Sequence, residues 1–466
     1  MKQNFRKVHF LGVCGTAMGA VAAMFKEDGF EVTGSDDHVY PPMSTFLEEK
    51  GIRVMTGFKP ENLRHKPDLV VIGNAISRGN AELEEVLDNR LYYLSLPETL
   101  RTFFLRQTHN IVVTGTHGKT TTTSLTAWIF EASGMKPSWL IGGIPLNFGE
   151  GCKRQDGQHW ILEGDEYDTA FFDKRSKFLH YLPELVIINN IEFDHADIFP
   201  SLEVIQTSFR RLVDIVPSNG MILLNADDPN AVAVTRHAKP QLLEIGLSPN
   251  AALRITDVRA DASGSTFRML EREFRIPLYG VHNVRNAGMA IAAAHFYQIP
   301  LDQIAAALAA FKGIKRRMEI KAEINGVTIV DDFGHHPTAL RETIGALRLK
   351  FPHRKLWALF EPRSNTTRRN VFQKELPAAL ALADGVFISQ VARLEQIPEE
   401  ERLNPEKVME DIARAGVPAY YEPNAAAIVA KLKPMLQPGD VVAVFTNGSF
   451  DGIHQKLVEA LATPQL

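Results

Sequence analysis

The chain has 466 residues, of which 45% are hydrophobic and 23% charged, and its formal net charge is −4. This length predicts roughly three domains of ~150 residues each, and the mild acidity gives no reason to expect a nucleic-acid partner. Only two cysteines occur, Cys14 and Cys152, which excludes a disulfide framework and fits a reducing cytosol. The polar N-terminus is unlike a signal peptide, and apolar runs stay short of the ~18 residues of a membrane span. We therefore expect a cytoplasmic protein without a membrane partner.

Short apolar runs alternate with amphipathic helical patterns, which predicts an α/β fold built mainly on parallel sheets. An antiparallel interlude of short strands is expected between about residues 253 and 279. Polar stretches at Arg106–Asn110 and Lys312–Arg317 look like domain joints and give domains 1–107, 108–313 and 314–466. The strands that we expect are Val8–Gly12, Leu69–Ile72, Ile111–Thr114, Leu185–Asn189, Thr328–Asp331, Lys355–Phe360 and Val441–Phe445.

The first glycine-rich loop follows the first predicted strand and opens a helix. Its spacing is Gly12-x-x-Gly15-x-x-x-Gly19, and Asp36 closes the next strand. This resembles a dinucleotide-binding turn but departs from the G-x-G-x-x-G fingerprint. The loop alone is compatible with a nucleotide diphosphate, with a nicotinamide cofactor, or with a purely structural turn.

A second loop, "VTGTHGKTTTT" (Val113–Thr123), lies between a predicted buried strand and a predicted helix. It lacks the first glycine of the G-x-x-x-x-G-K-[ST] pattern, because that position is Val113. Strand, glycine turn and helix N-terminus still present backbone N–H groups and a positive dipole end to phosphate. Lys119 can reach the β- and γ-phosphates, and Thr120 offers a hydroxyl to Mg²⁺. We interpret the loop as a shortened nucleoside triphosphate site.

This loop and four further segments resemble the motifs of the Mur ligases, the ATP-dependent amide-forming enzymes of bacterial cell-wall assembly. The likeness covers essentially the whole chain, with the motifs in the family's order. It implies a Rossmann-like N-terminal domain for a UDP-sugar, a central P-loop ATPase-like domain, and a Rossmann-like C-terminal domain for the amine or peptide. The five motifs are Gly115–Thr121, Leu162–Asp168, Asn189–His195, Gly280–Ala287 and Lys315–Ile320.

The resemblance implies ATP as substrate and Mg²⁺ as cofactor. Thr120, Glu163 and His195 would hold Mg²⁺, although nitrogen is an unusual ligand for this hard cation. From the residues alone, His195 is equally a buried, hydrogen-bonded histidine at a strand end. The implied ATP-binding residues are Gly115, Thr116, His117, Gly118, Lys119, Thr120, Thr121, His282, Asn283, Asn286, Arg317 and Asp332.

In the Mur ligases the first glycine loop holds the uridine diphosphate of the sugar substrate, and a helix N-terminus suits a diphosphate. The implied UDP-sugar residues are Gly12, Cys14, Gly15, Thr16, Met18, Asp36 and Asn74. The implied catalytic residues are Lys119, Arg317, His335 and His336. The last two are expected near the incoming amine, although two histidines before a proline also predict a solvated helix start.

Two members of the family use UDP-N-acetylmuramate itself as the acceptor. One adds L-alanine in new synthesis, and the other adds the recycled tripeptide L-alanyl-γ-D-glutamyl-meso-diaminopimelate. The alanine-adding member has no counterpart of Phe171–Phe178, and it carries arginines where this chain has Ser364 and Thr367. The segments that resemble the peptide-adding member are Ser35–Glu48, Gly73–Asn80, Phe171–Phe178, Glu361–Thr366 and Asn447–Leu457.

The resemblance therefore implies a ligase of peptidoglycan synthesis and recycling, and so of cell-wall biogenesis, cell shape and division. It would join UDP-N-acetylmuramate to the tripeptide through an acyl phosphate, as a monomer or weak homodimer in the bacterial cytoplasm. The L-alanine ligase is the alternative within the family. The predicted peptide-binding residues are Arg363, Ser364, Asn365 and Thr366, with Arg363 the candidate for a bidentate carboxylate contact.

When each motif is considered alone, other classes of protein remain possible. The first glycine loop alone allows a nicotinamide enzyme, and the second alone allows an ATP-driven motor or switch. A non-catalytic sugar-nucleotide sensor is a third possibility, against which the intact Lys119, Glu163 and His195 argue. Asp332–Gly334 spells the kinase "DFG", but the H-R-D-x-x-x-x-N catalytic loop is missing, so a kinase is excluded.

Overall fold

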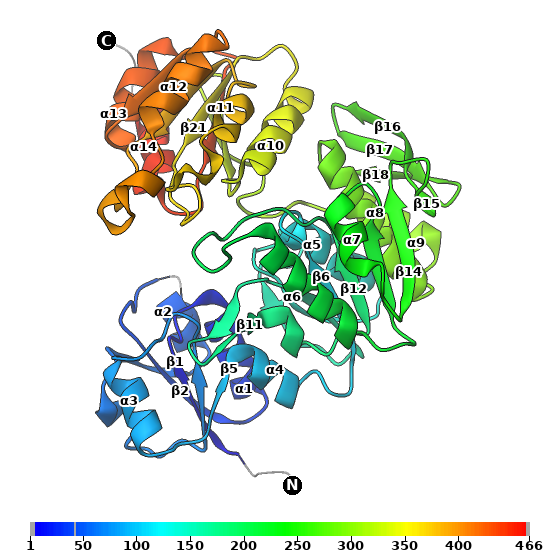
Figure 1. Cartoon of the computed structure of the whole chain (residues 1–466), viewed down its shortest axis with the longest axis vertical. Helices are drawn as coiled ribbons and strands as arrows, with labels where there is room; N and C mark the ends of the chain where they lie inside the picture. The colour runs from blue at the N-terminus through cyan, green and yellow to red at the C-terminus, as the bar shows by residue number, and fades with distance from the viewer. Residues whose placement is uncertain (1–4, 42, 463–466) are drawn as a thin grey trace.

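The structure is a computed structural model that describes residues 5–41 and 43–462. Pro42, which falls within the Ser35–Glu48 segment, lies outside the described residues. Figure 1 shows three α/β bodies that follow one another along the chain, the first in blue and the last in yellow to red. Each contains a mainly parallel sheet with helices against it, so the predicted α/β class is confirmed.

The N-terminal body contains a parallel five-stranded sheet of order β3-β2-β1-β4-β5. The chain builds outward from β1 to β3 and then returns to β4 on the other side of β1. The crevice at the carboxyl ends of β1 and β4 is thus a topological switch point, where open α/β sheets bind ligands. The elements are β1 (Lys7–Leu11), α1 (Thr16–Glu27), β2 (Glu31–Asp36), α2 (Met43–Glu49), β3 (Arg53–Thr56), β4 (Leu69–Ile72), α3 (Ala81–Asp88), β5 (Tyr93–Ser95) and α4 (Leu96–Phe103).

The central body has an eight-stranded sheet of order β15-β14-β13-β12-β6-β9-β7-β8. Only β8 pairs antiparallel among these strands. The first set of elements is β6 (His109–Thr114), α5 (Lys119–Ala132), β7 (Ser138–Leu140), β8 (Cys152–Lys153), β9 (His159–Glu163), β10 (Asp168–Ala170), β11 (Asp173–Ser176) and β12 (Leu185–Ile188). The second set is α6 (Leu202–Ile215), β13 (Met221–Asn225), α7 (Pro229–Thr235), β14 (Gln241–Gly246), α8 (Val281–Phe296) and α9 (Leu301–Ala309).

The antiparallel interlude is present as a three-stranded sheet of β16 (Thr256–Asp261), β17 (Gly264–Met269) and β18 (Arg272–Ile276). The prediction was wrong at its start, because β15 (Leu253–Arg254) pairs parallel with β14. Two residues suffice to extend the large sheet before the chain turns away.

The C-terminal body has a six-stranded sheet of order β19-β20-β24-β21-β22-β23, in which β19 alone runs antiparallel to its neighbour. Residues alternate between its two faces, as the period of two demands. Ala358 and Phe360 pack towards α10–α12, whereas Trp357 and Leu359 pack towards α13 and α14. The elements are β19 (Glu319–Ile324), β20 (Val327–Asp332), α10 (Pro337–Lys350), β21 (Leu356–Phe360), α11 (Glu375–Leu380), β22 (Gly385–Ser389), α12 (Pro405–Arg414), β23 (Ala419–Glu422), α13 (Ala425–Leu432), β24 (Val441–Phe445) and α14 (Ile453–Ala462).

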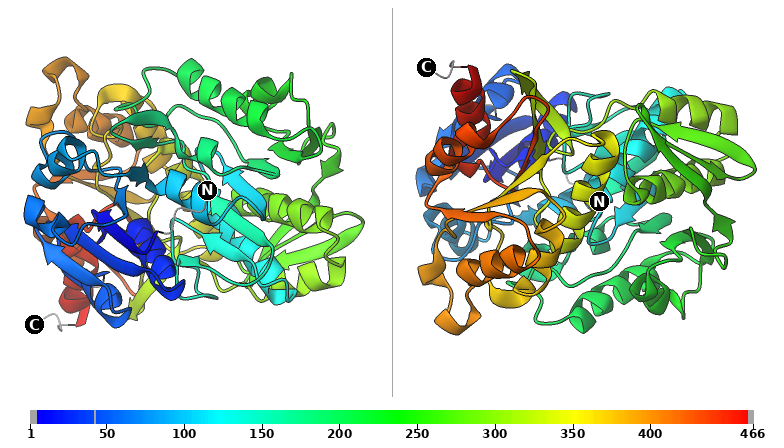
Figure 2. Two further views of the ribbon diagram at one scale, coloured as in Figure 1. Left: turned by 90° about the horizontal axis from the view of Figure 1, so that it is seen from below. Right: turned by 90° about the horizontal axis from the view of Figure 1, so that it is seen from above.

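The apolar cores join the first two bodies but leave the third separate. One buried cluster runs from Val8 and Phe25 through Phe104 to Trp160 and Phe209, so the first two bodies share a core. The C-terminal body has two clusters of its own, one on each face of its sheet, and Figure 2 shows the helices of this body in yellow to red. Among residues 5–41 and 43–462, no helix is long and apolar enough to cross a lipid bilayer.

The C-terminal core yields a stability prediction at Gly385. A Cβ there would overlap the six-membered ring of Trp357, which is fully buried. Gly385→Ala should therefore destabilise the domain by about 1–3 kcal/mol, the usual effect of overpacking. The matched control is Gly345→Ala, because a Cβ at this helical glycine meets open space and should stabilise by roughly 0.5–1 kcal/mol. Thermal unfolding measures both; equal melting temperatures for the two variants would contradict the assigned packing.

Candidate active site

The phosphate loop connects β6 to α5 at the carboxyl end of the central sheet. Gly115 and Gly118 have φ angles of +128° and +79°, which glycine adopts without strain. Gly118 caps α5, and a Cβ on it would overlap Oδ1 of Asn286. The turn therefore needs glycine at both positions, and it directs the N-terminus of a 14-residue helix into the site.

Lys119 begins α5 and is anchored by carbonyl and carboxylate oxygens. Its Nζ donates to the carbonyl of Gly115 at 2.8 Å and to Glu166 at 2.8 and 3.1 Å. Burial lowers the pKa of Lys119, but the surrounding carboxylates of Glu166, Asp165 and Glu163 outweigh it and raise the pKa overall. The lysine is therefore a permanently charged group in a largely buried position.

Glu163 ends β9 beside the loop. Its carboxylate accepts from the Thr120 hydroxyl at 2.8 Å and from the backbone N–H of Gly142 at 2.6 Å. Burial raises the pKa of Glu163, although these bonds and the charge of Lys119 oppose the shift. Two of the three predicted Mg²⁺ ligands are thus in direct contact, and they present the oxygen donors that this cation prefers.

His195, the third predicted ligand, contacts a different carboxylate. Its Nε2 lies 3.0 Å from Oε1 of Glu166, and its ring packs against Tyr167 with centroids 4.1 Å apart. Among the described side chains, its hydrogen bond is to Glu166 and not to Glu163. Burial lowers the pKa of His195, but Glu166 and Asp194 raise it overall. Glu166 therefore joins Lys119 to His195.

Glu166 is a site residue that the sequence interpretation missed. It is 2% exposed and lies in the quoted segment Leu162–Asp168, where only Glu163 received a role. The available signal was the second glutamate of the motif, since a buried carboxylate needs cationic or hydrogen-bonding partners.

Helix α8 carries three predicted ATP-binding residues, His282, Asn283 and Asn286, and brings one of them to the phosphate loop. Asn286 Oδ1 faces Gly118, whereas Asn283 donates to the carbonyl of Tyr279 at 2.8 Å. Burial, together with Arg285 and Arg317, lowers the pKa of His282 to about 4, so this imidazole is neutral. The structure thus places Asn286 at the phosphate loop, whereas Asn283 lies behind it and accepts from Asn286 Nδ2 at 3.4 Å.

The remaining loop residues, Thr116, His117 and Thr121, lie beside the segment that follows β12. The Thr116 hydroxyl donates to the carbonyl of Glu192 at 3.1 Å and accepts from its N–H at 2.8 Å. His117 N donates to Asn190 at 2.7 Å, and Thr121 is buried. The loop and the end of β12 therefore form one hydrogen-bonded unit.

The C-terminal body adds Arg317 and Asp332 from the joint between domains. The Arg317 guanidinium lies 5.3 Å from the centroid of the Phe333 ring. Asp332 accepts from the backbone N–H groups of Met318 and Gly334 at 2.9 and 2.7 Å, and burial raises its pKa. Arg317 is also close enough to lower the pKa of Glu163, so it faces the phosphate side of the central domain.

The two histidines before α10 differ in their surroundings. His336 caps the helix, because its Nδ1 accepts from the N–H of Thr338 at 3.2 Å, and it is 5% exposed. The predicted helix start is confirmed at this position. The prediction that it is solvated is wrong for His336, because this residue is buried. His335 points to the central domain, with Nε2 3.9 Å from Asp194.

Two of the predicted peptide-binding residues contact the central domain. Asn365 donates to Asp197 at 2.8 Å, and Thr366 donates to Asp194 at 2.9 Å. Ser364 instead shares a 2.8 Å hydrogen bond with Thr367.

The fourth of these residues, Arg363, is exposed and its guanidinium lies 3.6 Å from Glu361, over the backbone of Gly448. Of the four predicted residues, Arg363 alone is a cation that solvent reaches.

The first glycine loop surrounds the switch point of the N-terminal sheet. Gly12 has φ +83°, and Asp36 accepts from the N–H of Cys14 at 2.9 Å. Burial and the charge of Asp36 raise the pKa of Cys14 to about 11, so its thiol is neutral. Thr16 and Met18 open α1, and Gly15 is its N-cap. Asn74 is exposed just after β4, across the crevice.

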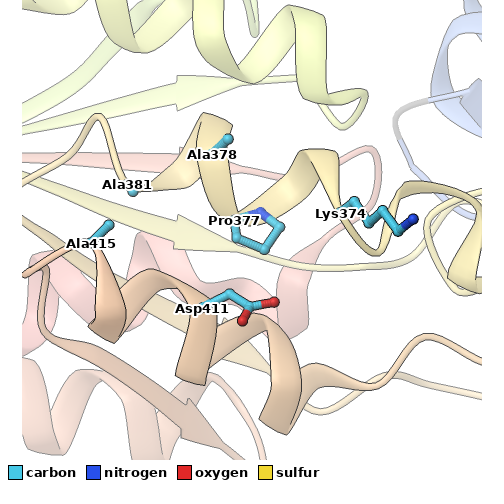
Figure 3. Close-up of a pocket in the computed structure, with 6 residues that line it drawn as sticks. All are labelled: Lys374, Pro377, Ala378, Ala381, Asp411 and Ala415. Carbon is cyan, nitrogen blue, oxygen red and sulfur yellow. The ribbon is translucent and has the colours of Figure 1, made fainter.

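A separate shallow pocket of about 320 Å³ lies between α11 and α12. Figure 3 shows its small side chains, with Lys374 and Asp411 at its borders. It is lined by none of the predicted site residues, so we do not assign it to catalysis.

Comparisons with known proteins agree with this architecture. The family model for the Mur ligase catalytic domain matches residues 7–108, that for the Mur ligase middle domain residues 113–294, and that for the glutamate ligase domain residues 316–448. Three α/β domains around a phosphate loop and a buried acidic cluster define a nucleotide-dependent ligase. The chain belongs to the Mur ligase family.

The chain is 44% identical over 464 residues to the UDP-N-acetylmuramate–L-alanyl-γ-D-glutamyl-meso-2,6-diaminoheptandioate ligase of Haemophilus influenzae, covering 98% of this chain and 99% of that one. The ligase of the same name from Escherichia coli K12 is 42% identical, with 98% of each chain covered. A UDP-N-acetylmuramate–L-alanine ligase from Sulfurihydrogenibium is 31% identical over 98% of each chain.

Solved structures of both kinds of ligase share the fold of this chain, and the peptide ligase has the higher sequence identity. A murein peptide ligase from Psychrobacter arcticus is 35% identical with a TM-score of 0.72, covering 98% of this chain and 99% of that one. A UDP-N-acetylmuramate–alanine ligase from Thermotoga maritima, at 22% identity and a TM-score of 0.77, supports the fold alone.

Glu166 yields the prediction of this site. Glu166→Gln removes the charge that holds Lys119 and His195, so we expect turnover to fall roughly 10- to 100-fold, as for other supporting residues of a charged site. ADP release at saturating ATP measures it. Asp168→Asn is the control, because Asp168 pairs with the solvent-exposed Lys174. Equal rates for the two variants would remove Glu166 from the catalytic unit.

Proposed function

We propose that the protein is an ATP-dependent ligase that joins UDP-N-acetylmuramate to L-alanyl-γ-D-glutamyl-meso-diaminopimelate in peptidoglycan recycling. The observation that supports it most is the phosphate-loop lysine held among Glu166, Glu163 and Asp165 at the carboxyl end of the central sheet. The substrates follow from the names of the relatives that match over the whole chain. We propose domains 1–107, 108–313 and 314–466 for the UDP-sugar, ATP and peptide, respectively.

The residues of the chain would act mainly by positioning and by charge, as phosphoryl transfer requires. The muramyl carboxylate oxygen attacks the γ-phosphorus, forming an acyl phosphate and releasing ADP. Lys119 and Arg317 approach from the two domains and stabilise charge on the transferring phosphoryl group. The amine nitrogen then attacks the acyl carbon, the C–O bond breaks, and inorganic phosphate leaves while the amine loses a proton.

Thr120 and Glu163 would hold Mg²⁺ together with His195, and the bound cation would neutralise phosphate charge. The Thr120 hydroxyl and the Glu163 carboxylate are oxygen donors that suit the ion as they stand. His195 would first have to give up its hydrogen bond with Glu166 in order to bind it. His335 is our candidate for orienting the amine or accepting its proton, because His336 is engaged in capping α10.

The proposal includes a bacterial cytoplasmic location and a monomer or weak homodimer as the working form. Both cysteines are free, which fits a reducing compartment.

The lysine provides the first test. Lys119→Ala should lower kcat by roughly 100-fold or more, as the loss of a charge-stabilising group does. ADP release with both acceptor substrates measures it, with Lys174→Ala as control because that lysine is exposed. The folded state is checked by circular dichroism. Near-wild-type turnover of a folded Lys119→Ala protein would place catalysis elsewhere.

Substrate choice provides the second test. A free amino acid presents its carboxylate beside the amine, whereas the tripeptide places charges several residues further away. Ser364 and Thr367 stand where the alanine-adding member carries arginines, and they hydrogen-bond to one another, while the exposed Arg363 suits a more distant carboxylate. We therefore expect kcat/KM for the tripeptide to exceed that for L-alanine by at least ~100-fold, beyond what one apolar contact supplies.

Arg363→Ala should raise the KM for tripeptide about tenfold or more with little change in the KM for ATP, since a charged contact is lost. Arg414→Ala is the matched control, because this arginine pairs with Asp411 on the outer helix α12. A preference for L-alanine would identify the biosynthetic ligase instead. NAD binding, or ATP hydrolysis independent of acceptor, would favour the other classes.

A further inference from the structure

One cluster of possible metal ligands lies outside the proposed Mg²⁺ site, and it includes one residue of the ATP-binding loop. It combines His117 of the phosphate loop, Glu192 after β12, and His336 at the start of α10. His117 Nε2 lies 3.4 Å from Glu192 Oε2, and His336 Nδ1 lies 3.6 Å from the same oxygen. We propose that these residues form a binding site for a divalent transition-metal ion of the zinc class.

The distances suit such an ion. Zinc binds histidine nitrogen and carboxylate oxygen at about 2.0–2.2 Å in tetrahedral geometry, which places ligand atoms roughly 3.3–3.6 Å apart. All three ligand atoms of the cluster lie within 4.8 Å of one another. Two imidazoles and one carboxylate, with a fourth position left for water, are a set that zinc uses in proteins.

The surroundings orient each ligand. Thr338 donates its hydroxyl to Glu192 Oε2 at 2.7 Å, and His336 Nε2 lies 3.3 Å from the carbonyl of Phe193. A proton on His336 Nε2 leaves the Nδ1 lone pair for the ion, and such outer partners are typical of metal-bound histidines. The ion would replace only the 3.2 Å bond that Nδ1 accepts from Thr338 N.

His117 supplies an independent indication. Its Nε2 is buried and makes no hydrogen bond of good geometry among the described residues, because its contact with Glu192 is long, at 3.4 Å. Buried polar atoms are rarely left in this state. The nitrogen faces Glu192, so an ion shared with the carboxylate would satisfy it.

A second cluster of similar composition is not assigned as a metal site, for a reason that the structure shows. Glu98, Asp173 and His180 also bring three ligand types together. There, however, Arg175 donates to both oxygens of Asp173 at 2.9 and 2.7 Å. The guanidinium occupies the carboxylate and adds positive charge, so a cation is disfavoured. Among residues 5–41 and 43–462, no lysine or arginine forms an ion pair with Glu192.

The location of the cluster predicts the effect of the ion. Two ligands belong to the central domain and His336 to the C-terminal domain, so a bound ion ties the two domains together through the phosphate loop. Since we propose that both domains act on ATP, a zinc-class ion should slow turnover while Mg²⁺ is present in excess. This consequence rests on the proposed function, whereas binding itself does not.

The test uses the full chain, freed of metal by chelation and kept in excess Mg²⁺. Co²⁺ is the probe, because a tetrahedral nitrogen-containing site gives strong visible absorption. We expect one equivalent to bind with this spectrum and Zn²⁺ to displace it. Glu192→Gln and His336→Asn should each weaken binding at least tenfold, and asparagine retains a favourable helix cap. Circular dichroism checks the fold of both variants. If only one of them folds, its Co²⁺ affinity alone decides the outcome.

Two controls separate this site from others. His180→Gln alters the cluster blocked by Arg175, and Glu163→Gln alters the proposed Mg²⁺ site; both should leave Co²⁺ affinity and spectrum unchanged. Loss of binding in Glu163→Gln, unchanged binding in the two cluster variants, or a weak octahedral spectrum would overturn the proposal and leave a hydrogen-bonded triad without an ion. Because binding is read without substrate, an inactive enzyme with the expected spectrum would refute the proposed function alone.

Discussion

The active site depends on one buried carboxylate, that of Glu166. Isolated charges are expensive to bury, yet the site must present a lysine to phosphate in a position shielded from water. Glu166 resolves this by accepting from Lys119 on one side and contacting His195 on the other. The phosphate loop, the end of β9 and the segment after β12 are thereby fixed relative to one another. When phosphate binds, the negative charge of the nucleotide would take over part of the pairing with Lys119 that Glu166 provides.

The domain contacts divide into apolar and polar kinds. The first two domains share a continuous apolar core, and such an interface resists opening. The C-terminal domain instead meets the central one through polar bonds from Asp194, Asp197 and Glu192. Polar interfaces of this type permit relative motion. Domain movement in a ligase cycle would therefore concern the C-terminal domain, and it would change the contacts of residues 192–197 together with those of α10 on α8.

The fold was largely predictable because buried parallel strands are continuous apolar runs. Leu69–Ile72 and Val441–Phe445 were located at their observed bounds, and the two glycine loops lie at carboxyl ends of strands as their sequences indicated. The pairing of β15 was not predictable, because two residues carry no periodicity. For the site, the loop pattern indicated Lys119 and Thr120, and the family resemblance indicated Glu163; the contacts of these three residues are local to one sheet edge.

Long-range partners were the part that sequence could not supply. Asn365 and Thr366 were predicted from their segment alone, but their hydrogen bonds go to residues about 170 positions earlier. Such contacts depend on how two domains dock, which no local pattern encodes. The same applies to His336, whose ring packs against His117 across the interface as well as against Phe372 of its own domain.

The hairpin of β10 and β11 shows how the rigid half of the enzyme is built. Phe171 packs against the apolar cluster of the N-terminal sheet, and Phe172 meets Tyr93 edge to face with centroids 5.1 Å apart. After the hairpin, Lys177 pairs with Asp165 at 2.9 Å, beside the carboxylates around Lys119. The segment thus connects the N-terminal domain to the acidic cluster. With these two parts held together, any adaptation to the longer amine substrate that we propose would fall to the C-terminal domain, where Arg363 is exposed.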